Sequence, residues 1–218
     1  LIVPHPKYLV PYDGVDEAVA ATATCSGITA YSALKKVRHL RSDEFLLIIG
    51  AGGVGLAGIG MAKAVVKAKI IVAEIDPAKR AAALEAGADV VLDNSETSAR
   101  EELISLTNGG PNAAIDFVGA PATVEFAFGA MAKGASLVLV GLYGGAAQLS
   151  TSLFPLKVNN ILGSFVGTQQ DLVELLQLFR EGKVKPVPMV RRSLREAPEA
   201  IQELREGKAL GRYVLIND

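Results

Sequence analysis

The fold is decided by one glycine-rich stretch, Ile49-Gly50-Ala51-Gly52-Gly53-Val54-Gly55. It follows the apolar run 45–49, which predicts a buried strand, and it opens the Ala- and Val-rich stretch 54–67, which predicts a helix. Glycines in a G-x-G-x-x-G pattern between a strand and a helix permit a tight turn, let the backbone approach a diphosphate and let the helix pack on the strand. The diphosphate then lies at the positive end of the helix dipole.

An acidic residue at the end of the next predicted strand supports this interpretation. Glu74 directly follows the apolar run 70–73, whereas Asp76 precedes Pro77 and is typical of a helix N-cap. An acid at the position of Glu74 accepts hydrogen bonds from ribose hydroxyls and repels a 2′-phosphate, so NAD is favoured over NADP. An overlapping glycine register, Gly53, Gly55 and Gly58, also fits the pattern. The strand end at Ile49 and the acid favour the first register.

Short apolar runs alternate with amphipathic stretches from residue 43 onward. The runs predicted to be strands are 45–49, 70–73, 89–92, 113–118, 136–140 and 161–166. This alternation predicts right-handed βαβ crossovers and a parallel sheet covered on both faces. The expected fold class is therefore α/β, with a doubly wound, six-stranded, Rossmann-type sheet.

The two ends of the chain do not continue this rhythm. Residues 1–42 contain a predicted helix at 25–38 but no strand–helix–strand unit, and residues 186–218 give a short strand, a helix and a last strand after Pro186-Val187-Pro188. We predict a dinucleotide-binding domain at 43–185, flanked by two pieces of a neighbouring domain. The chain does not begin with Met, and we expect that it is cut from a longer protein.

Composition excludes several classes of protein. The 218 residues include 22 Lys and Arg and 23 Asp and Glu, a balance that argues against a nucleic-acid-binding protein. Half of the residues are hydrophobic, which excludes disorder. A single cysteine with two histidines excludes a disulfide framework and a self-contained zinc site, and favours a reducing, cytoplasmic setting.

Two long uncharged runs, 45–62 and 134–156, could suggest membrane spans by their length. The first carries six glycines, and the second is broken by glycines, polar residues and Pro155. Buried parallel strands also give uninterrupted apolar runs, so we predict no membrane segment. The N-terminus has no basic segment followed by an apolar one, so we predict no signal peptide.

Two further candidates for chemistry lie before the glycine stretch. Cys25 is the only thiol, and its ordinary interpretation is a small buried residue, because neither His5 nor His39 has a spacing that suggests a base for a nucleophile. Tyr31 and Lys35 match the Tyr-x-x-x-Lys pair of short-chain dehydrogenases. Here the pair precedes the glycines instead of following them, so we predict helix surface without a catalytic role.

Several segments, taken in order along the chain, form a recognisable set. They are Cys25-Ser26-Gly27-Ile28-Thr29-Ala30-Tyr31, the glycine stretch, Glu85-Ala86-Gly87-Ala88-Asp89, Ile161-Leu162-Gly163-Ser164, Glu181-Gly182-Lys183-Val184-Lys185-Pro186 and Gly211-Arg212-Tyr213-Val214. With these segments the sequence resembles the medium-chain, zinc-type alcohol dehydrogenase family. The resemblance covers nearly the whole chain but only the back part of a family member.

The resemblance implies a cofactor domain inserted in a GroES-like catalytic domain. Residues 1–42 would then be the tail end of the catalytic domain with a linking helix, and residues 186–218 would return to it. It implies that Cys25 is one ligand of the catalytic zinc, which reverses the ordinary interpretation of that thiol. It also implies that Thr29 lies beside the nicotinamide.

The resemblance assigns the cofactor contacts as well. Glu74 corresponds to the ribose-binding acid, Lys79 to a lysine beside the adenosine and Arg212 to a cationic contact of the diphosphate. Three positions correspond to the lining of the nicotinamide pocket, namely Val118, Val140 and Val166. Together with the glycine loop, Gly50, Gly52, Gly53, Val54 and Gly55, these residues make up the expected cofactor site.

The implied function is the NAD-binding portion of a zinc-dependent alcohol dehydrogenase, which transfers a hydride between an alcohol and NAD to give an aldehyde or ketone. One thiolate cannot hold a catalytic zinc, which needs about three protein ligands, so we expect this chain to bind NAD without turnover. A zinc-free, NADPH-dependent quinone-oxidoreductase-like reductase and a non-catalytic NAD-sensing module are the alternatives. The family's usual homodimers or homotetramers pair through the cofactor domain, with the apolar stretch 136–156 as the expected contact edge.

Overall fold

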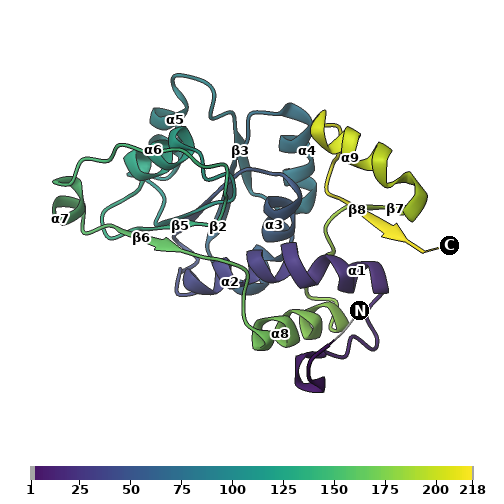
Figure 1. The fold of residues 1–218 in the computed structure, drawn as a ribbon. Helices are drawn as coiled ribbons and strands as arrows, with labels where there is room; N and C mark the ends of the chain where they lie inside the picture. The colour runs from purple at the N-terminus through teal and green to yellow at the C-terminus, as the bar shows by residue number, and fades with distance from the viewer. Residues whose placement is uncertain (1–2, 218) are drawn as a thin grey trace.

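The computed structural model describes residues 3–217. Figure 1 shows a central sheet with helices packed on both of its faces. The strands are β1 (Phe45–Ile49), β2 (Lys69–Ala73), β3 (Val90–Leu92), β4 (Ala113–Asp116), β5 (Ser136–Leu139), β6 (Asn160–Gly163), β7 (Met189–Ser193) and β8 (Arg212–Ile216). The α-helices are α1 (Glu17–Thr22), α2 (Ile28–Lys36), α3 (Gly53–Val65), α4 (Pro77–Ala86), α5 (Ala99–Leu106), α6 (Pro121–Ala130), α7 (Leu153–Lys157), α8 (Gln169–Arg180) and α9 (Ala197–Arg205).

Six parallel strands form the main sheet in the order β3-β2-β1-β4-β5-β6. This order confirms the predicted α/β class and doubly wound topology. The sheet begins with β1 in the middle and continues outward to β2 and β3. The chain then returns to form β4 on the other side of β1. At such a reversal the loops after the two central strands diverge and leave a crevice at the carboxyl edge of the sheet.

Side chains of β1 alternate between two hydrophobic clusters, one on each face of the sheet. Leu46 and Ile48 belong to the cluster formed with α2, α3, α4 and α8, whereas Leu47 and Ile49 belong to the cluster formed with α5 and α6. All four side chains are at most 1% exposed. The uninterrupted apolar run therefore reflects a strand covered on both faces, as predicted. No helix within residues 3–217 is both long enough and apolar enough to cross a membrane.

The stretch 136–156, which is expected to contain the contact edge, includes β5. This strand is paired on both sides, with β4 and with β6. β6 is the outermost strand on that side. An alternating apolar pattern cannot distinguish these two neighbours, because the difference depends only on the order of strands in the sheet.

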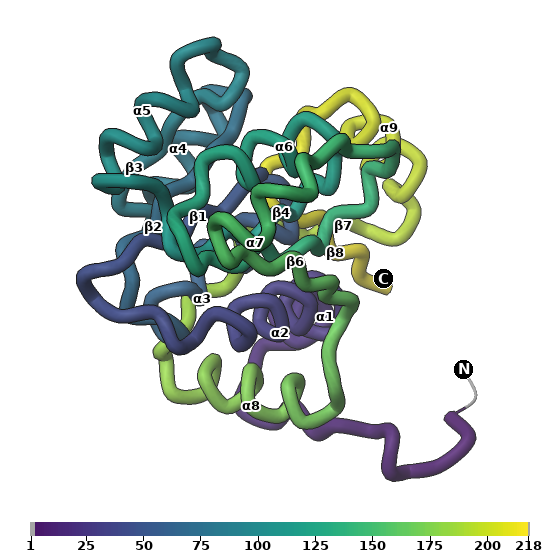
Figure 2. Tube along the Cα trace, turned by 90° about the vertical axis from the view of Figure 1, so that its left-hand side faces the viewer, coloured from purple at the N-terminus to yellow at the C-terminus, as the bar shows by residue number. Residues whose placement is uncertain are grey.

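The two flanking segments pack differently. α2 lies against α3 and α8, as Figure 2 also shows, and a short π-helical turn, Ala23–Gly27, joins it to α1. β7 and β8 form a separate two-stranded parallel sheet with α9 between them in the sequence. The strand–helix–strand order predicted for residues 186–218 is therefore present.

The Tyr31 and Lys35 side chains connect α2 to α8. The Tyr31 hydroxyl donates a hydrogen bond to Glu174 Oε2 (3.0 Å), and Lys35 Nζ donates to Asp171 Oδ1 (2.7 Å) and Glu174 Oε2 (2.8 Å). Tyr31 is buried, so it lies in a contact between helices, where free helix surface was predicted. Both side chains are engaged in joining the linking helix to the rest of the fold.

Candidate functional site

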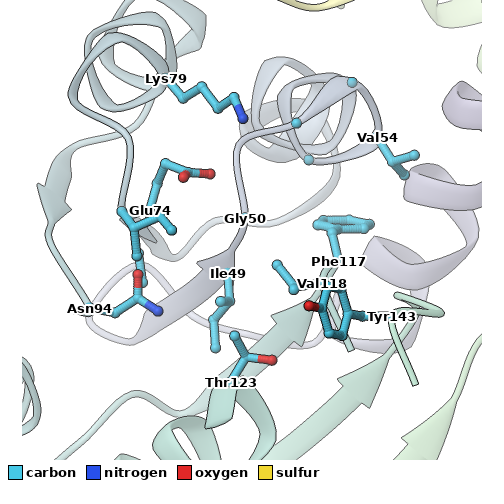
Figure 3. A pocket seen from close by; sticks show the side chains of 15 residues that line it. Ile49, Gly50, Val54, Glu74, Lys79, Asn94, Phe117, Val118, Thr123 and Tyr143 are labelled. Carbon is cyan, nitrogen blue, oxygen red and sulfur yellow. The ribbon is translucent and has the colours of Figure 1, made fainter. Parts of the chain in front are cut away.

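A cavity of about 460 Å³ opens at the carboxyl ends of the strands where the strand order reverses. Its walls come from residues that end or follow β1, β2, β3, β4 and β5 and from the first turns of α3, α4 and α6 (Figure 3). Residues from both sides of this reversal line the space. Its position is that expected for a ligand site in an open α/β sheet.

The glycine loop forms one wall of the cavity. Gly50 has a φ of +88°, in the left-handed region, which turns the chain sharply after β1. A Cβ atom at Gly55 would lie 1.9 Å from the carbonyl oxygen of Gly50, so only glycine allows α3 to start this close to the strand. A Cβ atom at Gly52 would meet no heavy atom within 4 Å. The first turn of α3 therefore presents its N–H groups to the cavity across an open surface.

Glu74 links the end of β2 to this loop. Its Oε2 accepts a hydrogen bond from the Ala51 N–H (2.7 Å), and its Oε1 accepts one from the Asp76 N–H (3.0 Å). The side chain is 8% exposed and lines the cavity. Each carboxylate oxygen keeps a further lone pair for another donor. Asp76 instead accepts from the N–H groups of Ala78 and Lys79, which confirms its predicted role as the N-cap of α4.

Two cations flank the glycine loop. Lys79 extends from α4, and Figure 3 shows its side chain directed toward the loop. Arg212, at the start of β8, packs against Gly53 so closely that a Cβ atom there would lie 2.6 Å from Arg212 Cδ and 3.2 Å from a guanidinium nitrogen. Positive charge from both residues thus lies near the start of α3, although Arg212 is not among the residues that line the cavity.

A third cation nearby, Arg80, fixes the loops through one nitrogen of its guanidinium group. Arg80 donates to the carbonyl oxygens of Glu74 and Ile75 (2.8 Å each) and to Asp93 Oδ2 (2.7 Å). These bonds tie the turn after β2 to the turn after β3.

The cavity brings together most of the cofactor residues expected from the sequence. Those that line it are Gly50, Gly52, Gly53, Val54, Gly55, Glu74, Lys79 and Val118. Val140 and Val166 are not among its lining residues. The Val140 N–H donates to the Asp116 carbonyl oxygen (3.0 Å), and Val166 lies beyond β6 with a φ of +49°, which is strained for a β-branched residue.

Several residues at the cavity had no signal in the sequence. Ile75, Asn94, Phe117, Thr123 and Tyr143 also line it. Each lies in or beside a loop that follows a strand, and position after a strand end was the only available hint. The predicted strand 113–118 concealed Phe117, because β4 ends at Asp116 and Phe117 belongs to the loop that follows.

Cys25 and Thr29 lie outside the cavity lining. Cys25 is exposed in the π-helical turn, and the Thr29 hydroxyl donates to the Cys25 carbonyl oxygen (2.6 Å). Within residues 3–217, no three His, Cys, Asp or Glu side chains gather as a metal site would require. A zinc ion does not fit the donors of this chain alone, since one thiol is too few.

Comparison with known proteins identifies the relatives of this chain. The model of the family described as zinc-binding dehydrogenase matches residues 53–181. Proteins named NAD-dependent alcohol dehydrogenase from Sulfurisphaera tokodaii and Saccharolobus solfataricus are each 38% identical over 99% of this chain, which spans 62% of their length.

Two solved structures are similar in fold and sequence. The alcohol dehydrogenase of Aeropyrum pernix matches with a TM-score of 0.86 and 33% identity, covering 95% of this chain and 60% of that one. The acetophenone reductase of Geotrichum candidum, solved in complex with NAD, matches with a TM-score of 0.82 and 28% identity, covering 93% of this chain and 57% of that one. Since the family model covers more than half of the sequence, the chain belongs to the zinc-binding dehydrogenase family.

Proposed function

We propose that this chain is the NAD-binding portion of a zinc-dependent alcohol dehydrogenase. The observation that carries the proposal is the bond between Glu74 and the glycine loop at the mouth of the cavity. It joins the acid that would bind the ribose to the turn that would bind the diphosphate. The names of the relatives, together with the NAD complex of the acetophenone reductase, support the same cofactor.

The roles of the residues follow from their positions. The diphosphate would lie over the first turn of α3, with Lys79 and Arg212 supplying positive charge on either side. The ribose hydroxyls of the adenosine would donate to Glu74. Bound NAD supplies a hydride acceptor at its nicotinamide ring, and this chain's contribution is to hold that ring in a fixed orientation. In the whole protein the substrate would be an alcohol or the corresponding carbonyl compound.

Charge favours NAD over NADP. A 2′-phosphate would come close to the Glu74 carboxylate, which would repel it, and the positive charge of Arg80 is already paired with Asp93. This argues against a zinc-free NADPH-dependent reductase. Titration calorimetry of this chain with NAD and with NADP tests the proposal. We expect NAD to bind at least about tenfold more tightly, a difference of about 1.4 kcal/mol, and equal affinities would refute it.

A non-catalytic NAD-sensing module remains a different class of function for the same cofactor site. The two are distinguished by assaying the longer protein for alcohol oxidation by the absorbance of NADH. An active enzyme forms NADH with at least one alcohol of a broad panel. A sensing module binds NAD and forms none.

We further propose that Cys25 supplies one zinc ligand in the whole enzyme, the remaining ligands coming from outside this chain. Because Cys25 lies outside the cavity, Cys25→Ala should change the NAD affinity of this chain by less than about twofold, as measured by calorimetry. In the longer protein the same substitution should abolish zinc binding and activity. Full zinc content in the variant would contradict the assignment, and Thr24→Ala, at the neighbouring exposed position, is the matched control.

Self-association through the β6 edge is part of the proposal, giving a homodimer or homotetramer. β6 has a free outer edge, and Leu156, Leu162 and Phe165 around it are exposed. Leu162→Lys should shift the chain toward monomers, because a charge on an edge strand opposes pairing with another strand. Sedimentation velocity checks this, with Leu106→Lys, at an exposed leucine on α5, as the control. Identical sedimentation of both variants would exclude this edge.

The exposed free thiol of Cys25 is consistent with a reducing environment, so a cytoplasmic location belongs to the same proposal.

A further inference from the structure

Asp116 is a fully buried acidic residue at the point where the strand order reverses. It is the last residue of β4, with Ile49 of β1 on one side and Leu139 of β5 on the other, and it is 0% exposed. It does not line the cavity itself. Burying a carboxyl group costs free energy unless its oxygen atoms are hydrogen-bonded, so the partners of Asp116 indicate which part of the fold it stabilises.

The side chain of Asp116 holds the loop that follows β4. Its Oδ1 accepts hydrogen bonds from the Val118 N–H (2.8 Å) and the Gly119 N–H (3.0 Å). Its Oδ2 accepts one from the Thr123 hydroxyl (2.7 Å) in the first turn of α6. The same hydroxyl accepts from the Ala120 N–H (3.1 Å), so one carboxyl group determines the path of residues 117–123.

The backbone of Asp116 holds the loop that follows β5. Its carbonyl oxygen accepts from the N–H groups of Val140 and Gly141, both at 3.0 Å. The two loops also contact each other, since the Tyr143 N–H donates to the Val118 carbonyl oxygen (3.1 Å). A Cβ atom at Gly119, which has a φ of +72°, would lie 2.1 Å from the Gly141 carbonyl oxygen. The backbones of the two loops are therefore in direct contact, and a residue larger than glycine at position 119 would force them apart.

These loops form the side of the cavity opposite Glu74. Val118, Thr123 and Tyr143 line it from the β4 and β5 half of the sheet, whereas Glu74 and Lys79 line it from the β2 half. In a doubly wound sheet each half receives one nucleotide of a dinucleotide. The adenosine half belongs to Glu74, so the β4 and β5 side receives the nicotinamide nucleotide.

We infer that Asp116 is the positioning residue for the nicotinamide half of the cofactor site. Its side chain acts through the loop 117–119 without lining the cavity, and it influences the loop 140–143 through the hydrogen bond from the Tyr143 N–H to the Val118 carbonyl oxygen. The inference rests on the proposed function, because it assigns the two halves of the same cavity to different residues. Glu74 serves the adenosine half and Asp116 serves the nicotinamide half. Loss of Asp116 should therefore weaken the binding of NAD while leaving the adenosine half intact.

The test compares NAD with ADP-ribose, which lacks the nicotinamide ring, by titration calorimetry on this chain. For Asp116→Ala we expect NAD to bind about tenfold more weakly and ADP-ribose to change by less than about twofold, because loss of the carboxyl group leaves buried amides without partners only on one side of the cavity. The fluorescence of bound NADH should also approach that of free NADH. A merely structural role would reduce the affinity for both ligands alike.

Asp116→Asn is the conservative variant that should rescue binding. The amide oxygen can still accept from both N–H groups, and the amide nitrogen can donate to the Thr123 oxygen, whose proton then turns to the Ala120 carbonyl oxygen 2.9 Å away. We expect NAD affinity within about threefold of that of the unaltered chain. If Asp116→Ala does not fold, Thr123→Val decides, since it removes the hydrogen bonds of the Thr123 hydroxyl with Asp116 Oδ2 and with Ala120 and should weaken NAD, but not ADP-ribose, by about threefold.

Equal losses for NAD and ADP-ribose, or unchanged NAD binding in both Asp116→Ala and Thr123→Val, would overturn the inference. Failure of the proposed function would give a different result in the same titrations. In that case the unaltered chain binds neither NAD nor ADP-ribose.

Discussion

Replacing Glu74 with alanine is expected to weaken NAD binding by at least about a hundredfold, close to 3 kcal/mol. The carboxylate would receive the ribose hydroxyls, and hydrogen bonds to a charged partner contribute about 1.5–3 kcal/mol each. The same substitution leaves the N–H groups of Ala51 and Asp76 without their acceptor, so the glycine loop also loses its support. Titration calorimetry measures the affinity, and thermal unfolding reports the loss of support separately.

Two variants sharpen this prediction. Glu74→Arg should reverse the cofactor preference toward NADP, because it replaces a charge that repels a 2′-phosphate by one that attracts it. Glu85→Ala, on the exposed face of α4, removes the same charge at a distance from the loop and should leave NAD affinity unchanged. Equal NAD affinities for Glu74→Ala and Glu85→Ala would remove Glu74 from the site.

A pair of glycine substitutions is expected to separate binding from folding. Gly52→Ala adds a methyl group that meets no heavy atom of the protein, at a φ of −74° that alanine accepts readily. Its free energy of unfolding should stay within about 0.5 kcal/mol of the original. The methyl group nevertheless occupies the surface over which the diphosphate must lie. NAD affinity should therefore fall by at least about tenfold.

Gly55→Ala should instead lower the stability of the fold. Its Cβ atom would lie 1.9 Å from the Gly50 carbonyl oxygen, so α3 must move away from the turn. We expect a loss of about 3 kcal/mol or more in the free energy of unfolding, measured by urea denaturation. A Gly52→Ala variant that binds NAD normally would place the diphosphate elsewhere, and a Gly55→Ala variant of normal stability would contradict the close approach.

Local sequence predicts those parts of the site that are formed by a single strand–turn–helix connection. The glycine loop and its acid belong to consecutive βα units, and their spacing reflects the sterics of a strand–turn–helix connection. The sequence favours Glu74 over Asp76 because Glu74 directly follows a strand and Asp76 precedes Pro77. In the structure Asp76 caps α4, whereas Glu74 accepts from the Ala51 N–H of the glycine loop. Buried parallel strands were recognisable because both of their faces are apolar.

The remaining parts depend on contacts between distant segments. The strand predicted at 113–118 ends two residues early because Asp116 accepts the N–H groups of Val118 and Gly119 and turns the chain out of the sheet. Asn94 and Tyr143 reach the cavity only because the strand order brings the ends of β3 and β5 to the same edge. No periodicity in the sequence contains that information.

The two hydrogen bonds that Glu74 receives from the backbone have a further consequence for affinity. A long, flexible acid normally loses rotational freedom when it captures a ligand, at a cost of about 0.5–1.5 kcal/mol for each immobilised side chain. Here the amides of Ala51 and Asp76 hold the carboxylate still beforehand. That entropy is lost during folding, so under the proposed function the ribose would meet an acceptor that is already preorganised.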